Sequence, residues 1–83
     1  MKRSNSHFLN DMKASIARIE TYIEDMDYDD FLEDDRTKDA VIRNLEIIGE
    51  AARNLDDEVR EEHRSVPWRK IIGLRNIISH AYF

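Results

Sequence analysis

The sequence predicts an all-α protein, because of its composition and of two long segments with helical periodicity. Its 83 residues include only two glycines and one proline, and glutamate, aspartate, arginine, isoleucine and alanine are abundant. Such a composition is typical of helices rather than of sheets. Apolar residues recur at steps of three and four in residues 8–26 and again in 41–55, the period of a helix with one buried face. We expect one small domain over residues 1–83.

The first predicted helix is followed by a strongly acidic connection. The apolar stripe of this helix consists of Phe8, Met12, Ile16, Ile19, Ile23 and Met26. Residues 20–35 then contain nine acidic residues and no basic one. We interpret the acidic stretch as a linker, in which Tyr28, Phe31 and Leu32 could pack as a short helical turn.

The second predicted helix runs from about Asp35 to Leu55, with an aspartate pair placed to cap its start. Its apolar stripe consists of Val41, Leu45, Ile48, Ala52 and Leu55, and the opposite stripe is charged: Arg36, Asp39, Arg43, Glu46, Glu50, Arg53 and Asp57. Opposite charges can pair along such a stripe. Two interpretations stay open, a solvated face of ion pairs or a face on which Glu50 or Arg53 meets a partner. Gly49 favours some packing or binding role, since glycine inside a helix costs roughly 1 kcal/mol relative to alanine.

The remaining chain predicts a short charged helix or turn at residues 56–64 and a final helix that starts at Ser65, Val66 and Pro67 and runs to the chain end. On an ideal helix the side chains of Arg75 and His80 lie about 140° apart. Asn76 and His80 form a polar strip that continues to Gly73, where the missing side chain predicts a notch in the surface.

Size and charge indicate what supports the fold and what the chain binds. A chain of 83 residues buries a thin core, and the absence of cysteine excludes disulfides, so we expect at least a dimer. No apolar run is long enough for a signal peptide or a membrane span, which favours a cytoplasmic protein. The net charge is −5, yet residues 64–83 carry Arg64, Arg69, Lys70 and Arg75 and no acid. This cationic quarter could attract phosphate.

Spacing alone leaves the polar residues of the last segment open to structural interpretations. His80 could stabilise the helix end, and Tyr82 could belong to the core. Arg75 on an apolar face needs an anion, for which Glu46, Glu50 or an RNA phosphate could serve. A second subunit related by a two-fold axis could bring arginine and histidine from both chains into one cleft.

The motif Arg75-x-x-x-x-His80-x-Tyr82, with Asn76 after the arginine, resembles the R-x-x-x-x-H-x-Y motif of HEPN-domain toxins. The stretches AVIRNLEIIGEAARNL, VPWRKIIGLRN and SHAYF resemble the HepT-like branch, whose members pair with minimal nucleotidyltransferase (MNT) antitoxins. The resemblance implies an antiparallel helical bundle of the HEPN type that forms a dimer. Family members usually continue into a further helix, so this chain, which stops at Phe83, is expected to lack the usual last helix.

The resemblance also implies a function: an RNA endonuclease toxin of a type VII-like toxin-antitoxin pair, acting without metal or cofactor. By position, Arg75 and His80 would be catalytic, Asn76 would position the RNA, and Tyr82 would be the tyrosine to which the MNT partner attaches AMP. The sequence has no HExxH pattern, calcium loop, glycine-rich phosphate loop or serine triad signature. The alternatives are a non-catalytic helical module that binds a nucleotidyltransferase or a nucleotide, and a structural fragment whose polar helix end faces solvent.

Overall fold

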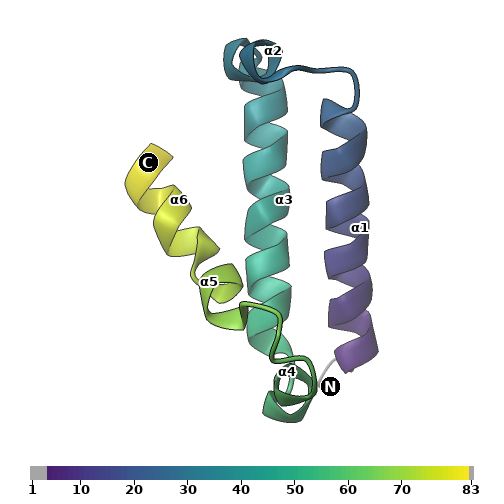
Figure 1. Cartoon of the computed structure of the whole chain (residues 1–83). Coiled ribbons are helices and arrows are strands. Elements are labelled where there is room, and N and C mark those ends of the chain that lie inside the picture. Colours follow the sequence, from purple (N-terminus) through teal and green to yellow (C-terminus); the bar gives the residue numbers. More distant parts are fainter. Residues whose placement is uncertain (1–3, 83) are drawn as a thin grey trace.

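The computed structural model describes residues 4–82, and for residues 81 and 82 it describes only the backbone. This part of the chain forms six helices and no strand: α1 (Asn5–Ile23), α2 (Tyr28–Glu33), α3 (Asp35–Asn54), α4 (Asp57–Glu62), α5 (Trp68–Ile72) and α6 (Leu74–Tyr82). The all-α prediction is confirmed. α3 lies in the centre, with the antiparallel α1 along one side and α5 and α6 on the other (Figure 1).

Helix α1 is attached to α3 at both its start and its middle. Ser4 caps α1 by accepting a hydrogen bond from the amide of His7. The side chain of Asn5 donates to the carboxylate of Asp56 and accepts from the Asp56 amide, each at 3.0 Å, which ties the start of α1 to the short connection that follows α3. Ser15 is fully buried, and its hydroxyl has no hydrogen-bond partner among the described residues. A small side chain here lets the two helix axes approach closely.

The acidic connection contains a formed helix, α2, rather than only a turn. Asp27 and Asp30 build a capping box at its start, each side chain accepting from the backbone amide of the other. Of the three expected anchors, only Phe31 is half-buried, whereas Tyr28 is 73% and Leu32 44% exposed. The prediction of a mostly solvated linker is confirmed, but the prediction that Tyr28 and Leu32 pack beside Phe31 is wrong.

The core is centred on the apolar stripe of α3, as the periodicity predicts. Val41, Ile48, Ala52 and Leu55 are buried, and Leu45 is half-buried. Asp34 caps the helix by accepting from the Thr37 amide at 3.0 Å. None of the described helices is long and apolar enough to cross a membrane.

A chain of hydrogen bonds connects the end of α3 to the start of α5. The guanidinium of Arg60, in α4, donates to the carbonyl oxygens of Ala52 and Arg53 in the last turn of α3. The indole N–H of Trp68 then donates to the carbonyl oxygens of Arg60 and His63, at 3.1 and 3.0 Å. These bonds fix where α5 begins. Of the two predicted alternatives for residues 56–64, a short charged helix or a turn, the structure forms the helix, α4.

The final segment is two helices rather than the single one that the sequence predicts. The helix is interrupted at Gly73, whose ψ of −4° departs from helical geometry, and Figure 1 shows α6 leaving α5 in a new direction. Proline is also placed differently, since Pro67 precedes α5 instead of lying in its first turn. The angles expected for one continuous ideal helix therefore apply only within α6.

Gly49 determines how closely α5 approaches α3. The residue is buried in α3, and a Cβ atom built on it would lie 2.9 Å from the carbonyl oxygen of Ile71 and 3.7 Å from Cβ of Leu74. Any side chain would push the end of α5 outward. The glycine predicted to have a packing role thus admits another helix of the same chain.

Gly49→Ala should destabilise the protein, although alanine is the better helix former. The backbone oxygen of Ile71 cannot move aside as a flexible side chain would, so we expect the free energy of unfolding to fall by roughly 1 kcal/mol or more. Thermal unfolding followed by circular dichroism measures the change. Ala17→Gly, at an exposed position of α1, measures the difference in helix propensity between alanine and glycine alone. A melting temperature raised by Gly49→Ala would contradict the close approach.

Asp34→Ala should lower the melting temperature in a pH-dependent way. The amide and hydroxyl of Thr37 lower the pKa of the Asp34 carboxyl below its ordinary value of 3.8. A lowered folded-state pKa stabilises the fold above that ordinary value, and the contribution is lost as the pH falls through the lowered one. The unmodified chain should therefore melt at a higher temperature than Asp34→Ala at neutral pH, and this difference should shrink in strong acid. The difference in melting temperature between Asp34→Asn, which keeps a neutral cap, and Asp34→Ala should not shrink in this way.

Candidate active site on helix α6

Helix α6 is anchored in the core by apolar side chains and leaves the candidate catalytic residues exposed. Ile78 is 5% exposed and belongs to the core, and Leu74 is half-buried. Arg75, Asn76 and His80 are all exposed. Core packing thus fixes the helix while the side chains of Arg75, Asn76 and His80 remain accessible.

Tyr82 ends α6, and its side chain lies outside the described residues. Its modification by AMP, which the resemblance implies, therefore stays a prediction.

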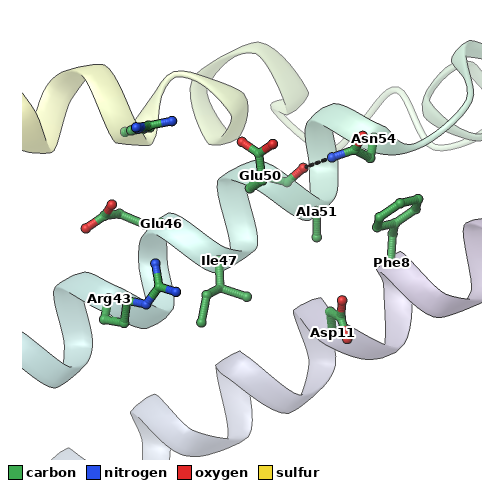
Figure 2. A pocket seen from close by; sticks show the side chains of 9 residues that line it. Phe8, Asp11, Arg43, Glu46, Ile47, Glu50, Ala51 and Asn54 are labelled. Carbon is green, nitrogen blue, oxygen red and sulfur yellow. Dashed lines mark hydrogen bonds between the residues drawn. The ribbon is translucent and has the colours of Figure 1, made fainter. Parts of the chain in front are cut away.

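A cavity of about 530 Å³ lies across the charged face of α3 and reaches α1 on one side and α6 on the other. Figure 2 shows Phe8 and Asp11 rising from α1, with Ile47 and Ala51 on the side of α3 that faces them and Glu50 on the far side. The residues that line the cavity are Phe8, Asp11, Arg43, Glu46, Ile47, Glu50, Ala51, Asn54 and Arg75.

The cavity brings Arg75 together with the acids proposed from the sequence as its partners. Glu46 and Glu50 line it along with Arg75, yet no ion pair joins them within the described part of the chain. Glu50 accepts a hydrogen bond at its backbone oxygen from the side-chain amide of Asn54, at 2.8 Å (Figure 2). The guanidinium of Arg75 therefore has acids nearby without an ion pair to them among the described residues.

The charged stripe of α3 is not closed by ion pairs within itself. Among the described residues, Asp57 is the one member of the stripe that forms an ion pair, and its partner Arg60 lies outside the stripe. The internal pairing that the spacing allows is thus not found. Three members of the stripe, Arg43, Glu46 and Glu50, line the cavity, and contact of Glu50 or Arg53 with a partner stays a prediction.

One chain does not bring Arg75 and His80 to a common point. Arg75 lines the cavity on α3, whereas His80 and Asn76 are not among the residues that line it. This separation agrees with the angle expected on an ideal helix. Gly73 does not form the predicted open notch: the residue is half-buried, and a Cβ built on it would lie 3.3 Å from the carbonyl oxygen of Arg69. It serves as the junction between α5 and α6.

A second hollow is lined by the cationic residues that precede the motif. Arg64, Arg69 and Lys70 are exposed and share this surface with Trp68 and the acids Asp57 and Glu61. Arg64 donates to Glu61 at 3.2 Å, and both side chains are well exposed. Because exposed ion pairs are weak, the basic side chains of this surface can turn toward a phosphate chain instead. Across residues 4–82, no three metal-ligating side chains gather in one place.

The described residues define an all-α protein that carries the motif on its last helix, and comparisons with known proteins identify its family. Residues 12–83 match the family model described as ribonuclease HepT-like. The chain belongs to the HepT-like family.

Its curated relatives bear names that fit this family. The chain is 42% identical over its whole length to a protein of Thermococcus cleftensis named "Probable ribonuclease HepT", of which it covers 76%. It is 43% identical over 99% of its length to a protein of Methanocaldococcus jannaschii named as a candidate RNase, of which it covers 75%. A second protein of that organism, 41% identical over the whole chain and covered to 37%, is named as a gamma-glutamylcyclotransferase and candidate RNase. No solved structure matches the chain.

Proposed function

We propose that the protein is a metal-independent RNA endonuclease in which Arg75 and His80 are catalytic and Asn76 positions the RNA. It would act as the toxin of a type VII-like toxin-antitoxin pair. The family and the names of the relatives support a ribonuclease-type function. The observation that carries the assignment of residues is the exposure of Arg75, Asn76 and His80 on a helix that Ile78 anchors in the core.

The residue types fit RNA cleavage by its own 2′-hydroxyl. An imidazole can take the proton of the 2′-hydroxyl while the 2′-oxygen forms a bond to phosphorus, and a second imidazole can protonate the departing 5′-oxygen. The products are a 2′,3′-cyclic phosphate and a free 5′-hydroxyl. The permanently charged guanidinium of Arg75 stabilises the negative charge that builds on the phosphate.

This chemistry needs two chains, because one chain separates Arg75 from His80. Pairing of two α6 helices around a two-fold axis would bring both arginines and both histidines to one groove. Ile77 supports such pairing, since it is 59% exposed beside Asn76 in an otherwise polar strip. A large apolar side chain in that place favours contact with another surface. The basic residues Arg69 and Lys70 would extend the groove along the RNA backbone.

We further propose that an MNT-type nucleotidyltransferase silences the enzyme by attaching AMP to Tyr82. The tyrosine follows His80 by two residues in the same helix. An attached AMP would add a negative phosphate to the surface that binds RNA, and it would block the groove by bulk and by charge repulsion.

RNA cleavage should persist in EDTA and should fall at least about 100-fold in His80→Ala, because the proton transfers lose their carrier. The measurement is cleavage of a labelled RNA by the purified full chain. Ser79→Ala, an exposed neighbour on the same helix, is the matched control and should keep its activity. Activity that requires magnesium, or that survives His80→Ala, would contradict the mechanism.

A non-catalytic module is the second candidate, and the separation of Arg75 from His80 within one chain is the observation that favours it. Binding to a nucleotidyltransferase or a nucleotide without RNA cleavage under any condition would support this candidate over the enzyme.

Co-expression with an MNT-type partner should increase the intact mass of the chain by whole AMP units. Tyr82→Phe should abolish the increase, because no phenolic oxygen is left to accept the nucleotide. Tyr28→Phe, which alters a tyrosine that is 73% exposed in α2, serves as the control and should be modified normally. An unchanged mass of the original chain would contradict modification while leaving the nuclease proposal open.

A further inference from the structure

The apolar stripe of α1 is wider than the surface that α3 covers. Ile16 and Ile23, which belong to the same stripe as the half-buried Met12 and Ile19, remain 45% and 38% exposed, and Leu9 at the edge of the stripe is 38% exposed. The three exposed residues are seven positions apart, so they lie almost in line, roughly 10 Å from one to the next. We call this row of exposed residues the α1 ridge.

The α1 ridge has the sequence pattern of a helix-pairing seam. From Leu9 to Ile23 its apolar residues alternate at steps of three and four, with Met12 and Ile19 between them, the pattern of a coiled-coil contact. A hollow of about 420 Å³ lies on the outer surface of α1 and is lined by α1 alone, through Leu9, Met12, Ile16 and their neighbours Ser6, Asn10 and Lys13. Apolar side chains from a second helix would fit this hollow.

The charges beside the α1 ridge indicate which helix fits there and in which direction. Lys13 and Glu20 are exposed, four positions after Leu9 and Ile16, respectively, and neither forms an ion pair within the described residues. If a second copy of α1 lies antiparallel with its centre at Ile16, Leu9 opposes Ile23 and Lys13 comes within one residue of Glu20 of the second copy. The symmetry gives this pair twice. A parallel arrangement would instead set Lys13 against itself.

We propose that the α1 ridge is an interface with a second copy of this chain, formed by antiparallel pairing of two α1 helices about a two-fold axis at Ile16. The charge complementarity of Lys13 and Glu20 is the argument for a second copy. The interface depends neither on nuclease activity nor on the motif in α6, because α1 and α6 lie on opposite sides of α3 (Figure 1). Pairing through α1 therefore leaves α6 free for the pairing that catalysis needs.

Charge exchange tests the proposal directly. The molar mass of the full chain is measured by sedimentation equilibrium over a range of concentrations at low ionic strength. Lys13→Glu should weaken association on the order of tenfold, since two symmetric pairs become repulsive at once, and Glu20→Lys should do the same. The double variant Lys13→Glu with Glu20→Lys should restore association, while Ala14→Glu, an exposed change elsewhere on α1, should have no effect.

Cross-linking gives a second measurement that tests the register. The chain has no cysteine, so a single introduced thiol can be oxidised without competing reactions. Ile16→Cys lies at the two-fold axis and should form a disulfide-linked dimer with its own copy. Leu9→Cys should not, because its two copies would stand roughly 20 Å apart along the antiparallel helices.

Several results would overturn the proposal. The chain could stay monomeric at every concentration, or the double exchange could associate as weakly as its single parents. Association lost in Ile77→Glu but unchanged in Lys13→Glu would assign the contact to α6 alone.

Retained RNA cleavage in the α1 variants, with reduced molar mass, would support an α1 interface separate from the active site. Loss of cleavage in His80→Ala leaves this interface unaffected, so the two proposals fail independently.

Discussion

The close approach of α3 and α5 at Gly49 is the contact on which the position of the motif depends. A backbone oxygen of Ile71 occupies the place where a side chain would begin, so no other residue allows this separation without a shift. Two residues after that contact the chain bends at Gly73, and the next helix carries Arg75 over the charged face of α3. Trp68 and Arg60 fix the other end of α5 through their hydrogen bonds. A short helix clamped at both ends thus sets the direction of α6.

Arg75 and His80 lie in different surroundings within one chain. Arg75 faces a cavity that contains both positive and negative side chains, whereas His80 and Asn76 lie on an open strip next to the exposed Ile77. In the proposed mechanism, a single copy would offer a guanidinium at one place and an imidazole at another. The proposed nuclease would therefore need a second copy to join them, and apolar side chains remain partly uncovered on both α1 and α6.

Periodicity predicted the long helices and the buried stripe of α3 because each follows from local spacing and capping chemistry, as at Asp34. It did not predict the break at Gly73, since glycine inside an otherwise helical pattern is compatible with either a straight or a bent helix. The cavity was predicted only in part. Glu46 and Glu50 were expected near Arg75, but Phe8 and Asp11 were not, because nothing local in α1 tells which side of α3 it will cover. The match to the motif, rather than any spacing, assigned chemical roles to Arg75 and His80.

Trp68 is the single tryptophan of the chain, and its indole N–H binds two carbonyl oxygens at the point where α4 gives way to α5. Its fluorescence therefore reports, without any label, on the docking of the helix that leads into the motif. Release of α5 would expose the indole to water and shift its emission to longer wavelength. The protein thus contains its own optical probe for the arrangement that brings Arg75 to α3, readable during unfolding, association or RNA binding.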